Sequence, residues 1–201
     1  MTNKATYLTL GILTGATVVS GAVLGAPRGM AETATRNASV TVSEACGFEA
    51  SGENARTRSL SPSAGQTLNT ESNPITTTVF CNRAGGFSVD VVGYSGNTTG
   101  NATMIGTSGG TIATATAGTA GGNSYWAVKF APVAGTYAPT VVSSYQSYNV
   151  IPTTATPLIS LNGTTTTTTG SSFNTYYQVY AAPNQGAGTY TGQVKYTLSQ
   201  S

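Results

Sequence analysis

Apolar and polar residues alternate along several short stretches of this chain, with the two-residue period of a β-strand that buries one face. The clearest case is residues 75–92, ITTTVFCNRAGGFSVDVV, where the alternation runs on both sides of residues 82–86. That central segment carries asparagine and paired glycines, which are typical of tight turns. We therefore expect two strands joined as a β-hairpin, with Cys81 on the inward face beside Val79.

Further strands are predicted where the same period or a short apolar run returns, at residues 38–43, 124–130, 157–161, 172–182 and 189–199. No stretch after residue 31 has the period of an amphipathic helix. Short strands separated by turn residues are typical of a β-sandwich or barrel, so the predicted fold class is all-β.

Two long segments lack this pattern and are predicted to be loops. Residues 50–73 are polar and irregular, with room for one short strand. Residues 93–124 are rich in glycine and threonine, and we interpret them as an insertion that forms a surface loop. Short strands at residues 102–106 and 111–117 are the alternative, although few large apolar residues there would specify their register.

Residues 1–31 have the features of a signal peptide. Lys4 supplies a positive charge ahead of an uncharged run over residues 5–26. Gly29 and Ala31 are small residues at the two positions that a signal peptidase recognises. The chain is therefore expected to be exported, to the periplasm, the cell surface or the medium.

Cleavage before Glu32 would leave one domain over residues 32–201, and cleavage after Ala22 is an earlier option. An uncleaved leader is the alternative, because the 22 residues at 5–26 are enough to span a membrane. Membrane contact is expected only through this segment, and only if it is retained.

The two cysteines, Cys46 and Cys81, lie 35 positions apart. Two cysteines in an exported chain are expected to form a disulfide bond. By the chain-entropy estimate, closing a loop of this length stabilises the fold by about 4 kcal/mol. A redox-active thiol is the alternative, but it would need a nearby second cysteine or basic neighbours.

The composition argues against catalysis and against metal or cofactor binding. Charged residues make up 7% of the chain, histidine is absent, and Asp90 is the single aspartate beside five glutamates. Serine and threonine nucleophiles therefore lack a histidine base, and two cysteines alone cannot form a zinc site. Without residues 1–31 the chain has six basic and six acidic residues, so no nucleic-acid partner is expected.

Three segments together resemble the spore coat protein U domain and the related archaic chaperone–usher pilins. They are SVTVSEACGF around the first cysteine, ITTTVFCNRAGGFSVDVVGYSG around the second, and GAGTYTGQVKYTLSQS at the C-terminus. The resemblance implies an immunoglobulin-like, pilin-like antiparallel β-sandwich that borrows a strand from a neighbour. It also implies a non-enzymatic structural subunit of a pilus or coat.

In that family, the segment before the first cysteine inserts into the next subunit. Carried over, Ala38, Val40 and Val42 would be the donor-strand residues, and residues 189–198 would border the acceptor groove. The implied partners are copies of the chain itself or related subunits, and a periplasmic chaperone. The physical basis is β-augmentation, in which backbone bonds supply affinity and alternate side chains fill pockets.

A strand at residues 38–43 that folds back into its own domain would give a different protein, a self-complete monomer. Such a chain would serve as a surface adhesin or ligand-binding module. Tyr176 and Tyr180, which share the predicted outer face of one strand, are its candidate surface aromatics.

Overall fold

The computed structural model describes residue 39 and residues 41–49, 59–119, 121–165 and 169–201. The chain divides into two compact units, Met1–Thr41 and Val42–Ser201, and the fold described below is that of the second. The expected signal peptide at residues 1–31 lies outside the described residues.

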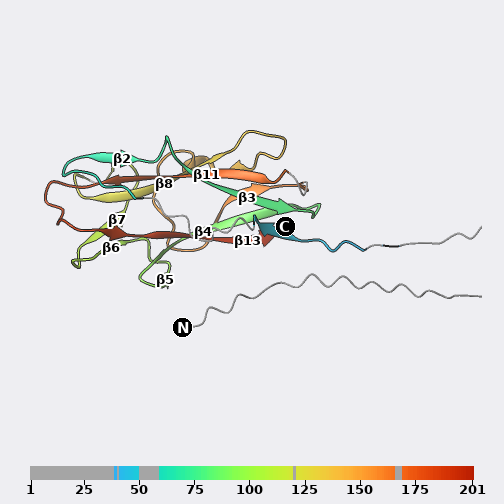
Figure 1. Ribbon diagram of the computed structural model, residues 1–201, viewed down its shortest axis with the longest axis horizontal. Helices are drawn as coiled ribbons and strands as arrows, with labels where there is room; N and C mark the ends of the chain where they lie inside the picture. The colour runs from blue at the N-terminus through green and yellow to red at the C-terminus, as the bar shows by residue number, and fades with distance from the viewer. Residues whose placement is uncertain (1–38, 40, 50–58, 120, 166–168) are drawn as a thin grey trace, which may run out of the picture. The chain divides into compact units, whose positions relative to one another are not determined.

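The second unit is all-β and consists of two sheets (Figure 1). Among the described residues, the first sheet has eight strands. In spatial order they are β1 (Cys46–Phe48), β3 (Ile75–Cys81), β11 (Ser171–Tyr180), β8 (Tyr125–Pro132), β7 (Thr111–Thr114), β6 (Met104–Gly106) and β12 (Tyr190–Thr191), with β2 (Thr67–Asn69) also paired to β11. The second sheet has five: β13 (Gln193–Gln200), β4 (Phe87–Ser95), β10 (Thr156–Leu161) and β9 (Thr140–Val141), with β5 (Thr98–Thr99) beside β4. One 3-10 turn, Ser143–Tyr145, follows β9.

The first sheet curls toward the second at the β7–β6 end (Figure 1). β7 pairs parallel with β8, whereas the other strand pairs among the described residues are antiparallel. Gly192 alone separates β12 from β13, so the chain passes from one sheet to the other at a single residue. A side chain there would lie 2.9 Å from Trp126 and Met104, which is why the position requires glycine.

The core lies between the two sheets, and the predicted inward faces supply it. Phe87, Phe130 and Phe173 are fully buried, as are valines of β3, β4 and β8. The rings of Phe130, Phe173 and Tyr196 meet edge to face, with centres 5.7 to 6.3 Å apart. These contacts come from both sheets and bind the two layers together.

The predicted hairpin at residues 75–92 is wrong in its pairing, although both strands exist. β3 pairs with β1 and β11 in the first sheet, and β4 pairs with β13 and β10 in the second. Residues 82–86 therefore cross from one sheet to the other. Alternation reports which side chains face the core, and both arrangements bury the same residues, so the pattern does not distinguish them.

The surface-loop interpretation of residues 93–124 is also wrong. The structure forms β5, β6 and β7 there, and β6 and β7 lie within the two alternative strand positions. Ala102 and Ile112 are buried, and the indole N–H of Trp126 donates a hydrogen bond to the carbonyl oxygen of Ala102 (2.7 Å). Residues 93 and 102 are small because their backbones approach each other closely. A side chain at Gly93 would lie 2.7 Å from Ala102.

Candidate functional site

The predicted disulfide bond between Cys46 and Cys81 is present. Cys46 begins β1 and lies opposite Cys81, the last residue of β3. Cys81 is buried, and its backbone N–H donates a hydrogen bond to the hydroxyl of Thr165 (2.8 Å). The bond thus fastens residue 46 to the end of the first sheet, where the N-terminal segment leaves it.

Asn82, the residue after β3, holds the chain that precedes β1. Its side-chain oxygen accepts a hydrogen bond from the backbone N–H of Ala45 (2.5 Å), and its side-chain amide donates one to the carbonyl oxygen of Ser43 (2.9 Å). Its backbone N–H donates to the carbonyl oxygen of Ala45 (3.0 Å). Asn82 therefore binds residues 43–45 much as a neighbouring strand would. The sequence suggested only a turn residue at this position.

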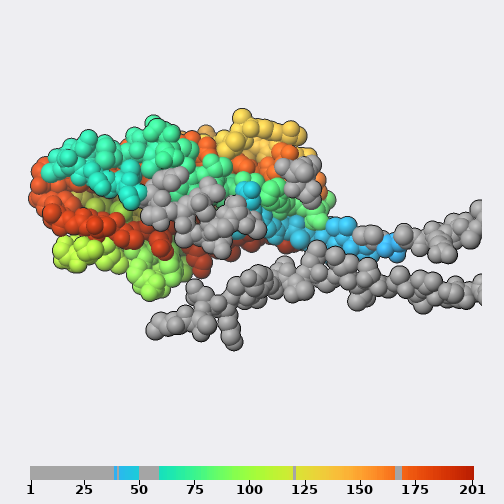
Figure 2. Space-filling view, viewed as in Figure 1, coloured from blue at the N-terminus to red at the C-terminus, as the bar shows by residue number. Residues whose placement is uncertain are grey.

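The described residues of the expected strand at 38–43 belong to neither sheet. Ser39 and residues 41–43 lie in no strand, and the side chain of Val42 is 76% exposed. Residues 42–45 extend beyond the end of the two sheets (Figure 2). Ala38 and Val40, the other candidate donor residues, lie outside the described residues.

β13 forms an edge of the second sheet. It pairs with β4 along its length and, within the part of the chain that the structure describes, with no other strand. Val194, Tyr196 and Leu198 pack against the core from β13 but are only half-buried. An edge strand with an incompletely covered apolar face can accept an added strand.

Buried hydroxyl groups lie beneath this edge. The hydroxyls of Tyr196 and Thr175 are 2.9 Å apart and share a hydrogen bond. Burial raises the pKa of Tyr177 to about 12, although a hydrogen bond with Tyr196 lowers it in part. Burial and the neighbouring Tyr177 raise the pKa of Tyr196 well above its ordinary value. Both phenols are therefore neutral at physiological pH.

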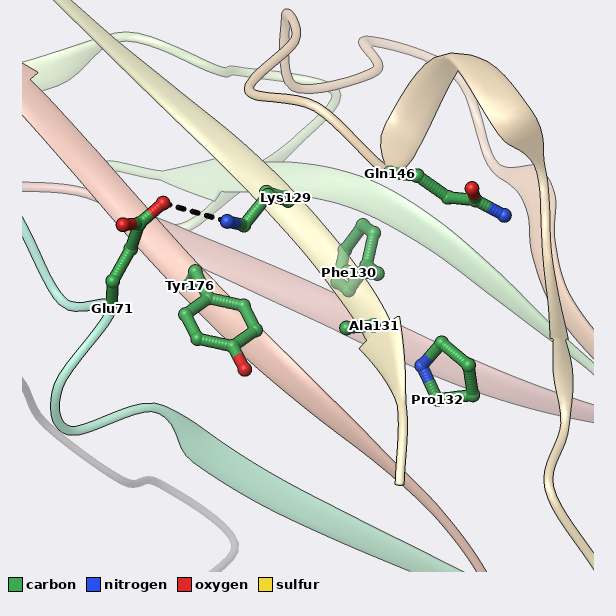
Figure 3. Close-up of a pocket in the computed structure, with 7 residues that line it drawn as sticks. All are labelled: Glu71, Lys129, Phe130, Ala131, Pro132, Gln146 and Tyr176. Atoms are coloured by element: carbon green, nitrogen blue, oxygen red, sulfur yellow. Dashed lines mark hydrogen bonds and ion pairs between the residues drawn. The ribbon is translucent and has the colours of Figure 1, made fainter. Parts of the chain in front are cut away.

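An open hollow of about 370 Å³ lies beside Lys129 (Figure 3). The residues around it are Glu71, Lys129, Phe130, Ala131, Pro132, Gln146 and Tyr176. The ammonium of Lys129 donates a hydrogen bond to the Glu71 carboxylate (2.7 Å). It also lies 4.7 Å from the ring centre of Tyr176 and 4.9 Å from that of Tyr148. Residues of the same chain thus neutralise and enclose this charge.

The two candidate surface aromatics are part of a packed cluster on the outer face of the first sheet. Tyr176 and Tyr180 are half-buried against Tyr125, Ala127 and Tyr148, and the rings of Tyr125 and Tyr180 are 5.8 Å apart. Burial is the main cause that raises the pKa of Tyr148. The outer face of β8 and β11 is therefore covered in part, which outward alternation alone did not predict.

Neither metal-binding clusters nor membrane-spanning helices occur in the described part of the chain. No group of three or more His, Cys, Asp or Glu side chains gathers there to hold a metal ion. No helix among the described residues is long and apolar enough to cross a membrane. The features that stand out are the N-terminal segment, the β13 edge and the hollow beside Lys129.

Comparisons with known protein families, with curated protein sequences and with solved structures found no match. The resemblance to spore coat protein U and archaic pilins therefore rests on the three sequence segments quoted for it.

Proposed function

We propose that this chain is a non-enzymatic, exported structural subunit of a surface fibre or coat, and that its subunits join by β-strand donation. The N-terminal segment of one copy, residues 38–43, would pair with the β13 edge of the next. The finding that carries the proposal is the position of Val42, an apolar residue of an alternating stretch that is exposed and lies in no strand of its own chain.

The donor chemistry follows from the alternation of residues 38–43. Ala38, Val40 and Val42 would share one face of a strand, with serine and threonine on the other. Burying one valine side chain contributes about 1.5–3 kcal/mol, and the backbone bonds to an edge strand add to this. A lone exposed strand gains neither contribution, so a second copy of the chain is the expected occupant.

The acceptor chemistry follows from β13. Its half-buried Val194, Tyr196 and Leu198 form an apolar strip along an edge that pairs with no further strand among the described residues. A donated strand would cover that strip and extend the second sheet by one strand. This proposal includes an immunoglobulin-like sandwich that the donated strand completes. It also includes export into an oxidising compartment, where the Cys46–Cys81 bond persists.

The test compares assembly of three proteins that begin at Glu32: the unaltered chain, Val40→Ser/Val42→Ser, and Ser39→Ala/Thr41→Ala as the matched control on the opposite face. Size-exclusion chromatography with light scattering measures their oligomers after refolding. We expect the unaltered chain and the control to form multimers, and the valine variant to stay monomeric. Monomers in all three, with unchanged stability when residues 32–43 are deleted, would rule the proposal out.

Ligand binding at the cell surface is the second candidate function. The hollow beside Lys129 supports it, because Glu71, Gln146 and Tyr176 bring polar groups and a ring edge together there. Lys129 is already engaged by Glu71 and two tyrosine rings, so the residues also have a role in packing. Binding of a soluble glycan that Tyr176→Ala abolishes, by a chain that stays monomeric, would favour this function over assembly.

A further inference from the structure

We propose that Asn82 is a positioning residue that keeps the N-terminal segment from pairing with β13 of its own chain. The segment then remains available to a second copy. This inference rests on the proposed function, and it assigns to one side chain the choice between self-pairing and donation.

The contacts of Asn82 are those that would direct a strand. Its side-chain oxygen and amide bind Ala45 and Ser43, at 2.5 and 2.9 Å, and its backbone N–H adds a third bond to Ala45 at 3.0 Å. The bonds alternate along residues 43–45 as in an antiparallel ladder, which favours an extended backbone. Turning the chain within these residues would break the two side-chain bonds.

Self-pairing requires such a turn. β1 runs from Cys46 along β3, away from the end of that strand, whereas residues 42–45 extend beyond the end of the sheets (Figure 2). The disulfide bond holds residue 46 in place. To pair with β13 of the same chain, the segment that precedes residue 42 would have to double back over residues 43–45, the stretch that Asn82 holds.

The turn that carries Asn82 also contacts the end of β13. The backbone N–H of Ser201 donates a hydrogen bond to the carbonyl oxygen of Gly86 (3.3 Å), and the guanidinium of Arg83 donates one to the side-chain oxygen of Gln200 (3.4 Å). Arg83 also forms an exposed ion pair with Glu44 at 3.8 Å. One short turn therefore sets the direction of the outgoing segment relative to the edge that it must avoid.

The experiment compares Asn82→Ala with Asn184→Ala, an exposed asparagine in the turn before β12, in full-length mature protein. The first measurement is amide hydrogen exchange of residues 41–43 in dilute monomer. Unaltered protein and Asn184→Ala should exchange rapidly there. Asn82→Ala should be protected about fivefold or more, since each lost hydrogen bond shifts the equilibrium toward self-pairing by about that factor. Equally rapid exchange in all three proteins would overturn the inference.

The second measurement is the rate of assembly, which should fall about fivefold or more in Asn82→Ala and stay unchanged in Asn184→Ala. Asn82→Asp keeps the acceptor for Ala45 but loses the donor to Ser43, so its rate of assembly should lie between those of Asn82→Ala and the unaltered protein. If Asn82→Ala fails to fold, Asn82→Asp takes its place in both measurements. A variant that is destabilised but assembles at the normal rate would assign Asn82 a role in folding alone and overturn the inference.

A peptide of residues 32–45, ETATRNASVTVSEA, separates this inference from the proposed function. Added in excess to dilute unaltered protein, it should bind at β13 and protect the amides there. Failure to bind would count against strand donation itself. Binding to the unaltered protein, together with equal binding to Asn82→Ala, would leave donation standing and refute the role of Asn82, because a self-paired segment should compete with the peptide.

Discussion

Thr175 on β11 and Tyr196 on β13 share a hydrogen bond of 2.9 Å that joins the two sheets through the core. Thr175 is fully buried, so its hydroxyl has no access to water. The bond lies directly beneath the edge that we propose as the acceptor. This polar contact fixes the position of β13. A core made only of apolar side chains would fix that position less strictly.

The first prediction concerns this contact. Tyr196→Phe removes one hydroxyl and leaves the buried Thr175 hydroxyl without that partner, which should lower the free energy of unfolding by about 1–3 kcal/mol. Urea denaturation measures the change. Tyr94→Phe, at a half-buried tyrosine on the neighbouring β4, is the control and should change stability by less than about 0.5 kcal/mol. Equal effects of the two substitutions would contradict a specific role for the bond.

The second prediction concerns alkaline pH. In the unfolded chain Tyr177 and Tyr196 ionise near pH 10, whereas in the folded chain burial raises both pKa values, that of Tyr177 to about 12. The unfolded state therefore loses protons first, so stability is unaffected by these groups below about pH 10 and falls as the pH rises from 10 through 12. Urea unfolding at a series of pH values measures the decline.

Tyr177→Phe provides the control for the alkaline prediction, because it removes one of the two buried phenols. Its stability should fall less steeply with pH than that of the unaltered chain, and its tyrosinate absorbance should lose the step near pH 12. An identical pH profile in the variant would show that other groups cause the alkaline loss.

The third prediction concerns the disulfide bond between Cys46 and Cys81. Replacing both cysteines with alanine reopens a loop of 35 residues and should cost about 4 kcal/mol of unfolding free energy. Denaturant unfolding of the oxidised protein and of the double variant measures the difference. Reductant should destabilise the unaltered chain and leave the double variant unaffected. A difference below about 1 kcal/mol would mean that the bond adds little beyond the pairing of β1 with β3.

The fourth prediction concerns the passage between the sheets at Gly192. A methyl group there would lie 2.9 Å from Met104 and Trp126, so Gly192→Ala should destabilise the fold by about 1–3 kcal/mol through overpacking. Gly135→Ala is the matched control, because its methyl group would meet nothing within 4 Å. Thermal unfolding of both variants compares them, and equal melting temperatures would refute the close approach.

Much of the local structure was predictable from the sequence. Alternation or a short apolar run located the strands that became β3, β4, β8, β10, β11 and β13, and alternation placed Val79 and Cys81 on an inward face, where both are buried. The disulfide bond was predictable because the chain was expected to be exported and its two cysteines have one pairing available. These features depend on residue type and on neighbours within a few positions, which a sequence displays directly.

The candidate site was predictable only in part. Val42 was expected in a strand that is either donated to a neighbour or paired within its own domain, and it is exposed outside both sheets. Asn82 gave no signal beyond its preference for turns, because its side chain bonds to residues 37 and 39 positions earlier in the chain. Tyr176 and Tyr180 were expected to face solvent, but the segment around Tyr148 packs against the cluster that contains them.

The sequence by itself determined where the long strands β3, β4, β8, β11 and β13 lie, which face of β3 is buried, and that the two cysteines pair. Only the tertiary structure decided that β3 and β4 belong to different sheets and that residues 93–124 contribute strands rather than a loop. The physical reason is that a two-residue period follows from local backbone geometry, whereas the partner of a strand depends on backbone bonds to distant segments. The edge position of β13 and the hydrogen bonds of Asn82 to residues 43–45 also depend on contacts between distant segments. Only the folded chain therefore shows them.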